Sequence, residues 1–241
     1  MKKQKIVVFS GAGISKASGI DTFRGSDGLY NNYNIDDVVT IEGWNKNPQL
    51  VLDFHNELRR LIKDKQPNEA HLSLVKLEEY FEVIHVTQNI DDLFEKAGAT
   101  NILHLHGQLN KCRSTEDNYE LYDCNEDINL GDACNAGYQL RPFTVLFGEY
   151  PYYVEDAYRA MMTCDHLLIV GTSLNISYTL NMIKSVNKMT TVYYIDPQPS
   201  EVLNYSLPNI IYCRQPAEVA LPLLVDSLIK SQQHPLTLTE N

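Results

Sequence analysis

The sequence predicts an α/β fold built on a doubly wound parallel sheet. Six short apolar runs, rich in β-branched and aromatic residues, have the length and composition of buried strands. Segments with the apolar spacing of helices lie between these runs. Strands that are apolar on both faces need helices on both sides of the sheet. The six runs span 5–9, 82–87, 102–105, 166–171, 191–195 and 210–213.

Three of the intervening segments have a helical stripe of apolar residues. They span 47–62, 70–81 and 216–229, and the last keeps its stripe despite an internal proline, Pro222. The first of these segments places four apolar residues on one face: Leu50, Phe54, Leu58 and Leu61.

Two regions interrupt the alternation of strands and helices. Residues 31–78 are helical without a strand, and residues 110–142 are polar and irregular, longer than an ordinary loop in a compact domain. We expect both to be insertions that build a smaller lobe, with a ligand cleft between the lobes at the carboxyl ends of the strands. The chain would then be one domain over 1–241, with a large lobe made of 1–30, 79–109 and 143–241.

The composition argues against several classes of partner. With 20 basic and 31 acidic residues the net charge is −11, so we expect no nucleic-acid partner. No stretch approaches the ~20 apolar residues of a membrane helix, so we expect no membrane partner. An odd number of cysteines without a tight pair, and an opening segment without a signal-peptide cleavage site, favour the reducing cytoplasm. Nothing in the sequence specifies an oligomeric state.

The first apolar run leads into a glycine turn, GAGIS, at 11–15. Such a turn lets a phosphate approach bare backbone N–H groups. The dinucleotide fingerprint is incomplete because Lys16 stands at its third glycine position, so a nucleotide loop and a plain structural turn are equally favoured. The segment 18–30 that follows contains Phe23 and Arg24, and is either a flap over a ligand or a solvated surface loop.

Polar side chains follow the second run, in the stretch VTQNIDD at 86–92. Gln88, Asn89 and Asp91 are placed at a strand end, where side chains point into the cleft of such folds. The alternative is that Asn89 or Asp91 caps the following helix, which requires no ligand.

Two histidines lie in the next strand and its end. His104 and His106 alternate, so only one can face the cleft. We expect His106, beside Gly107, to be that residue and His104 to be buried. Histidine suits the role of a general base because its ordinary pKa lies near 6.5. A further strand ends in Gly171, and Asp196 ends the one after it, where an acidic residue commonly binds ribose hydroxyls.

Seven segments together resemble the sirtuin family, over essentially the whole chain. In order they are GAGIS, TFRGSDGLY, TQNIDD, HLHG, RPFTVLFGE, GTSL and PAEVALP. The resemblance implies a Rossmann-like large lobe with a small lobe of two insertions. It also implies an NAD-dependent protein-lysine deacylase, in which NAD is a consumed co-substrate, nicotinamide is released, and the acyl group passes from lysine to ADP-ribose. The partners would be proteins with acylated lysines.

The resemblance also assigns residues. His106 matches the base that activates a ribose hydroxyl, with Asn89 and Asp91 as further catalytic residues. Val145, Leu146, Phe147 and Gly148 match the strand that pairs with the substrate peptide by β-augmentation. The residues that match the cofactor site are Gly11, Ala12, Gly13, Ser15, Thr22, Phe23, Arg24, Gln88, Asn89, Ile90, Asp91, Gly171, Thr172, Ser173, Asp196 (where relatives usually have asparagine) and Ala217.

The chain departs from the sirtuin branch that TFRGSDGLY resembles, which removes malonyl and succinyl groups. That branch reads the acyl carboxylate with a Tyr-x-x-Arg pair, because arginine binds carboxylates in a bidentate fork. Here His55 and Leu58 stand at those positions, and Arg59 lies about 100° further around the helix. We therefore expect uncharged acyl groups to be preferred over succinyl. The chain also has SYT, 177–179, where relatives have a Pro-Ala pair.

Other functions compete with deacylation. A protein ADP-ribosyltransferase or an NAD hydrolase would use the same cofactor, but the HLHG motif favours deacylation. A non-catalytic NAD sensor would not need the histidine base beside the amide residues. A dehydrogenase would need the full glycine fingerprint and a hydride partner, and neither is evident.

The second insertion contains three cysteines, Cys112, Cys124 and Cys134. Most sirtuins have two C-x-x-C pairs in this place that hold a structural zinc ion. The cysteines here form no such pair, so we expect a zinc-free module without disulfides. Its fold would be held by packing of Tyr119, Leu121, Tyr122, Ile128 and Leu130.

Overall fold

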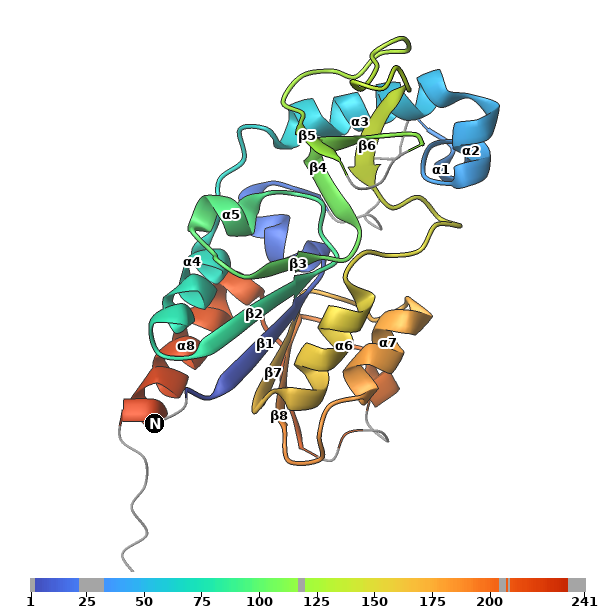
Figure 1. Ribbon diagram of the computed structural model, residues 1–241. Coiled ribbons are helices and arrows are strands. Elements are labelled where there is room, and N and C mark those ends of the chain that lie inside the picture. The colour runs from blue at the N-terminus through green and yellow to red at the C-terminus, as the bar shows by residue number, and fades with distance from the viewer. Residues whose placement is uncertain (1–2, 22–32, 117–119, 204–206, 208, 234–241) are drawn as a thin grey trace, which may run out of the picture.

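A six-stranded parallel sheet organises the chain, as predicted (Figure 1). The computed structural model describes residues 3–21, 33–116, 120–203, 207 and 209–233. The strand order is β3-β2-β1-β7-β8-β9, which places the reversal between β1 and β7. This is the strand order of dinucleotide-binding Rossmann sheets, whose ligands bind at the reversal. The strands are β1 Lys5–Ser10, β2 Glu82–Thr87, β3 Ile102–His104, β7 His166–Val170, β8 Thr191–Ile195 and β9 Ile210–Cys213.

Two apolar clusters sandwich this sheet because its strands are apolar on both faces. In β1, Ile6 and Val8 belong to the cluster under α4 (Glu69–Lys76) and α8 (Ala217–Gln233). Val7 and Phe9 belong to the cluster under α6 and α7. The remaining elements of this lobe are η1 Ala12–Ser18, η2 Leu77–Glu79, α5 Leu93–Ala97, α6 Val154–Thr163, α7 Ser177–Lys184 and η3 Glu201–Leu203.

A smaller lobe lies beyond the carboxyl ends of the strands, at the top of Figure 1. It combines three helices with a three-stranded antiparallel sheet of order β5-β4-β6. The second insertion is thus not irregular as expected. The sequence pattern does not predict its strands because they are mostly polar. In addition, the pairing of β4 with β6 is interrupted by a bulge between Gln108 and Cys112. The elements are α1 Ile35–Val38, α2 Ile41–Lys46, α3 Pro48–Ile62, β4 Gly107–Ser114, β5 Leu121–Asp123 and β6 Leu140–Thr144.

The contacts place the boundaries between the lobes differently from the sequence prediction. Ala70, Leu74 and Leu77 lie in the core of the large sheet, so α4 and η2 pack with the large lobe although 31–78 was assigned to the smaller one. At the other boundary, β4 begins at Gly107 and pairs with β6, whose last residue is Thr144.

The predicted apolar face of α3 is only partly correct. Phe54 and Leu58 are buried, but Leu61 is half exposed. The face that is buried against the second insertion is instead polar, because His55, Asn56 and Arg59 lie there.

Asn56 fastens α3 to the second insertion. Its side-chain amide donates to the Ile128 carbonyl oxygen (2.9 Å), and its Oδ1 accepts from the Ile128 backbone N–H (2.9 Å). Arg59 donates to the same Oδ1 (2.7 Å) and to the Leu109 carbonyl oxygen (2.9 Å). Paired in this way, these buried polar groups join segments that are distant in the sequence.

Glu149 joins two buried arginines just after β6. Its carboxylate accepts from Arg141 at 2.8 and 3.0 Å and from Arg113 at 3.0 Å. It also accepts from the Leu146 backbone N–H at 2.8 Å, which fixes the turn that follows β6. Both guanidinium groups are almost fully buried, so their charges depend on this carboxylate.

None of the helices in the described part of the chain combines the length and the apolar character needed to cross a membrane.

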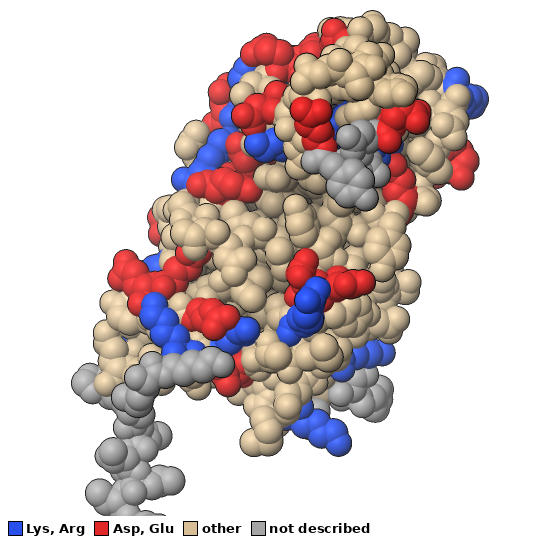
Figure 2. Space-filling view, in the orientation of Figure 1, with Lys and Arg blue, Asp and Glu red and all other residues tan. Residues whose placement is uncertain are grey.

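Figure 2 shows acidic and basic side chains gathered at the two ends of one face, with largely uncharged surface between them.

Substitution of Glu149→Gln should lower the free energy of unfolding by about 3 kcal/mol, because it leaves two buried guanidinium charges without a counter-charge. Urea denaturation measures this. Glu155→Gln is the control, since Glu155 pairs with Arg159 on the exposed face of α6, and it should change little. Equal effects of the two substitutions would contradict the role of Glu149.

Candidate active site

Two glycine turns meet at the reversal of the sheet. The Gly13 backbone N–H donates to the Gly171 carbonyl oxygen (2.8 Å), and the Gly11 N–H donates to that of Val170 (3.0 Å). A Cβ on Gly13 would lie 2.7 Å from the Gly171 Cα, and Gly171 has φ of +59°. These glycines therefore have a structural reason in the close approach of the two turns. That approach lies at the reversal of the sheet, the position where such folds bind phosphates.

Ser15 connects the glycine turn to the end of β2. Its hydroxyl donates to Asp91 Oδ2 (2.9 Å) and accepts from the Asn89 side-chain amide (3.1 Å). All three side chains are buried. Burial raises the pKa of Asp91, and the hydrogen bonds from Leu93 and Ser15 oppose that rise.

Asp91 also performs the alternative role considered from the sequence. Its Oδ1 accepts from the Leu93 backbone N–H (3.2 Å), at the first residue of α5. The carboxylate therefore caps the start of α5 with one oxygen and binds Ser15 with the other, so the two roles coexist.

A pocket lies against this cluster, between the lobes. Its volume is about 400 Å³, including space open to solvent. The large lobe contributes its polar side through Asn89 and Asp91, and α3 contributes an apolar side through Leu58. The lining residues are Ala12, Ser15, Ile20, Asp21, Leu58, Ile62, Asn89, Ile90, Asp91 and Leu109. The surface of the pocket is thus mainly apolar, with Asn89 and Asp91 on its large-lobe side, as ligand pockets commonly are.

Gln88 links the end of β2 to the second glycine turn. Its side-chain amide donates to Thr172 Oγ1 (3.1 Å) and lies 3.3 Å from the Ser10 carbonyl oxygen. Ser173 follows with an exposed side chain. Asp196 follows β8, where its Oδ1 accepts from the Gln198 N–H (2.8 Å), and burial raises its pKa. Ala217 is buried at the start of α8.

His104 is buried and doubly hydrogen bonded. Its Nδ1 donates to the Asn89 carbonyl oxygen (2.9 Å), and its Nε2 donates to Glu95 Oε1 (2.8 Å). Both partners only accept, so the ring is held as imidazolium. Burial lowers the pKa of His104, but the bond and charge of Glu95 outweigh it and the net shift is upward. The pKa of Glu95 is lowered, because His104 outweighs the effect of burial there as well.

His106 contacts the neighbouring residue of the same turn. Its Nδ1 donates to the Gln88 carbonyl oxygen (2.8 Å), one residue before the carbonyl that His104 binds. Its Nε2 accepts from the hydroxyl of Tyr178 at the start of α7 (2.7 Å). Burial lowers the pKa of His106, and the bond to Gln88 opposes that shift. The ring is therefore neutral and fixed in one tautomer at neutral pH.

The residues predicted to pair with a peptide follow β6 directly. The Val145 N–H donates to the His106 carbonyl oxygen (3.0 Å), so this segment starts beside the histidine. Phe147 forms an isolated bridge to Thr40, and its side chain is 65% exposed. Leu146 is buried, and Gly148 has φ of +98°, with Ile41 filling the place of a Cβ.

Three of the predicted cofactor residues, Thr22, Phe23 and Arg24, lie outside the described residues. Among the others, Ala12, Ser15, Asn89, Ile90 and Asp91 meet at the pocket. Gln88 and Thr172 bond to each other, while Asp196 follows β8 and Ala217 begins α8.

The cysteine-containing insertion is held by apolar and polar packing. Cys112 and Cys124 are buried in a cluster with Leu52 and Ile128, and all five cysteines are free thiols. Within the described ranges, no group of three or more His, Cys, Asp or Glu is arranged to hold a metal ion. The absence of zinc stays a prediction. Of the predicted packing residues, Tyr122 and Ile128 pack in this cluster, Leu121 and Leu130 are exposed, and Tyr119 lies outside the described residues.

Several site residues were missed by sequence reasoning. Ile62 and Leu109 line the pocket, and Glu95 holds His104. Tyr178, which contacts His106, lies in the SYT segment that differs from the sirtuin pattern. The difference in the SYT segment was the available sign of this contact. It could not be interpreted from the sequence, because the contact depends on how α7 packs.

The His104–Glu95 ion pair predicts a defined dependence of stability on pH. The stabilisation by the pair is complete between about pH 4.5 and about pH 6.5. The lower limit is the ordinary pKa of Glu95 and the upper limit is that of His104. As pH rises through the raised pKa of His104, the contribution is lost. We expect wild type to exceed Glu95→Gln by about 1 kcal/mol near pH 6, and by less at pH 9.

Urea denaturation at a series of pH values measures this difference. The matched control is Asp226→Asn, which breaks a surface pair with Lys76, a group that stays charged over this range. A difference between wild type and Glu95→Gln that is constant from pH 6 to pH 9 would show that His104 is not charged in the fold.

The comparisons with known proteins agree with this geometry. The Sir2 family model matches residues 11–178. An NAD-dependent protein deacylase of Helicobacter pylori is 41% identical over 228 residues, which cover 94% of this chain and 98% of that protein. One of Bacteroides thetaiotaomicron is 40% identical over 202 residues, which cover 81% and 86%.

Solved structures show the same similarity. A Sir2 homologue–NAD complex superposes with a TM-score of 0.82 at 29% identity, covering 95% of this chain and 91% of that one. A Sir2 homologue in complex with ADP-ribose superposes with a TM-score of 0.79 at 29% identity, covering 99% and 96%. The match extends over both lobes and over the turns that form the pocket. The chain therefore belongs to the Sir2 family.

Proposed function

We propose that this protein is an NAD-dependent deacylase that removes acyl groups from protein lysine side chains. The observation that carries the proposal is the joint geometry of the site. A neutral histidine, His106, lies beside the segment expected to pair with a peptide, and a pocket lined by Asn89 and Asp91 lies beside the glycine turns. The relatives named as NAD-dependent protein deacylases support it.

The residues present fit NAD. The close packing of Gly13 on Gly171 brings the two turns together at the reversal of the sheet, where phosphates bind in such folds. The large-lobe side of the pocket, at Asn89 and Asp91, is where the nicotinamide ribose would lie, and the side formed by Leu58 on α3 remains for the acyl group. Asp196, at the end of β8, is placed to accept from the hydroxyls of the other ribose.

NAD supplies an activated ribosyl carbon that receives the acyl oxygen of the substrate. The chain orients both reactants and takes up the proton that the reaction releases. Gln88 and Asn89 are fixed at the end of β2 by Thr172 and Ser15. His106 is fixed with Nδ1 as donor, so Nε2 is the nitrogen that takes up a proton. O-acyl-ADP-ribose and nicotinamide are the expected products.

The pocket supports a preference for uncharged acyl groups. Leu58 lines it together with Ile62 and Leu109. Arg59 is buried and does not line the pocket, and it donates to the Leu109 carbonyl oxygen and to Asn56. His55 is also engaged, at the Val51 carbonyl oxygen and Thr144 Oγ1, and burial lowers its pKa to about 4. Neither residue is among those that line the pocket, so the pocket lining supplies no cation to an acyl carboxylate.

Substitution of His106→Ala should lower kcat for deacylation by at least about 100-fold, because it removes the base. NAD affinity should stay within about twofold, since the glycine turns and Asn89 are unchanged. Mass spectrometry of an acetylated peptide with NAD measures O-acyl-ADP-ribose, and calorimetry measures NAD binding. His166→Ala, at the opposite end of the sheet, is the control. Free ADP-ribose or ADP-ribosylated protein as the main product would instead identify a hydrolase or a transferase.

A second experiment tests acyl preference. For the wild-type protein, kcat/KM should be higher for removal of acetyl or fatty acyl groups than for removal of succinyl groups. Leu58→Arg should raise the ratio of kcat/KM for succinyl to kcat/KM for acetyl at least about tenfold. The reason is that a guanidinium group in the pocket can bind the succinyl carboxylate through two hydrogen bonds. Leu61→Arg is the control, since Leu61 is exposed on the same helix. A dominant succinyl rate in wild type would contradict the proposed preference.

A further inference from the structure

Both ring nitrogens of His106 are already occupied by protein groups. Nδ1–H donates to the Gln88 carbonyl oxygen (2.8 Å), and a carbonyl oxygen accepts only. A neutral ring with its hydrogen on Nδ1 has a single accepting lone pair, on Nε2. That lone pair receives the Tyr178 hydroxyl at 2.7 Å. A substrate hydroxyl therefore meets the ring only through Tyr178 or by displacing it.

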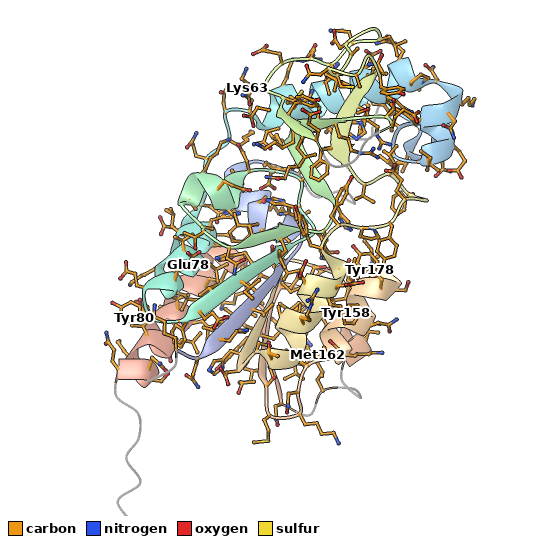
Figure 3. All side chains as sticks on the ribbon, viewed as in Figure 1. Lys63, Glu78, Tyr80, Tyr158, Met162 and Tyr178 are labelled. Atoms are coloured by element: carbon orange, nitrogen blue, oxygen red, sulfur yellow. The ribbon has the colours of Figure 1, made fainter. Side chains whose placement is uncertain are left out.

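Packing resists displacement of Tyr178. The side chain is partly buried against the core cluster under α6 and α7, and burial raises the pKa of its hydroxyl. Its ring meets the His106 ring edge-on, with centroids 6.2 Å apart. Figure 3 labels Tyr178 on α7 at the end that faces the smaller lobe, and Tyr158 further along on α6. The hydroxyl is thus held at Nε2 by a side chain anchored in the large lobe.

The other titratable groups near His106 are engaged elsewhere. Asp91 accepts from Ser15, and His104 donates to Glu95. Tyr152, from the segment after β6, stacks on Phe143. Among the described residues, no charged side chain from these elements contributes to the pKa of His106, which burial lowers and the bond to Gln88 raises. Tyr178 is therefore the polar side chain that decides what reaches Nε2.

We propose that the Tyr178 hydroxyl relays the proton from the substrate sugar to His106. This rests on the proposed function, in which His106 is the base. Tyr178 accepts the proton of a ribose hydroxyl while its own proton passes to Nε2. His106 becomes imidazolium with N–H at both nitrogens, tyrosine ends neutral, and the sugar oxygen keeps its electron pair as the nucleophile. The ring stays bonded on both sides throughout, because Nε2–H then donates to the tyrosine oxygen.

The test is Tyr178→Phe, which removes the hydroxyl and keeps the ring that packs against the core. We expect kcat for deacylation to fall at least about tenfold, with KM for NAD within about twofold and an unchanged melting temperature. Tyr158→Phe is the matched control, because Tyr158 packs partly buried in the same cluster and should leave kcat unchanged. An unchanged or higher kcat in Tyr178→Phe would show that substrate displaces the hydroxyl, and would overturn the relay.

A second readout needs neither NAD nor activity. NMR titration of ¹⁵N-histidine-labelled free protein, assigned with His106→Ala, measures the pKa of His106. The tyrosine oxygen must accept from the charged ring for a relay to work, and such charge-assisted bonds are stronger than neutral ones. Tyr178→Phe should therefore lower this pKa by about half a unit to one unit. No change, or a rise, would overturn the relay.

The two readouts separate this proposal from the proposed function. If His106→Ala keeps full deacylation, His106 is not the base and the proposed mechanism fails, whatever the titration shows. If His106→Ala is inactive while Tyr178→Phe is fully active, the base assignment stands and only the relay fails.

Discussion

The site depends on one close approach, between the glycine turns that follow β1 and β7. The Gly13 backbone lies against Gly171, so closely that a Cβ on Gly13 would overlap it. This contact fixes the direction in which both chains leave the sheet. From the first turn the chain enters η1 and places Ser15 against Asn89 and Asp91. From the second it passes Thr172, which binds Gln88, and enters α7 with Tyr178. Ser15 at the pocket and Tyr178 at His106 therefore both lie on segments that leave this contact.

The smaller lobe reaches a defined fold through buried polar groups on α3. Asn56 and Arg59 bond to backbone atoms of the second insertion, and Cys112 and Cys124 pack beside them with Leu52. Glu149 likewise joins segments at the small sheet, because its carboxylate pairs with two buried arginines, Arg113 and Arg141. Because Asn56 and its partner Ile128 are 72 residues apart in the sequence, α3 and the second insertion are joined only by contacts of the folded chain. Its α3 then supplies the apolar wall of the pocket through Leu58.

The parallel sheet, the cluster at the end of β2 and the different surroundings of His104 and His106 were predictable. Each follows from a local rule: apolar runs form strands, polar residues at strand ends face the cleft, and alternate residues face opposite ways. The antiparallel strands of the second insertion were not predictable in this way. They are short and polar, and their pairing partners are supplied by segments up to 37 residues apart, as between Gly107 and Thr144. Leu61 was misplaced because the helical period does not reveal that α3 buries polar residues.

The sequence by itself determined the parallel sheet and its glycine turns, because these depend on hydrophobic periodicity and on the backbone freedom of glycine. Only the tertiary structure decided what each polar side chain is bonded to. Arg59 directly follows the pocket residue Leu58 in the sequence, yet its guanidinium donates to the Leu109 carbonyl oxygen and to Asn56. Tyr178 is 72 residues from His106, yet its hydroxyl occupies the accepting nitrogen of the ring. Hydrogen bonds are directional and short, so their partners follow from packing between elements, which no local pattern contains.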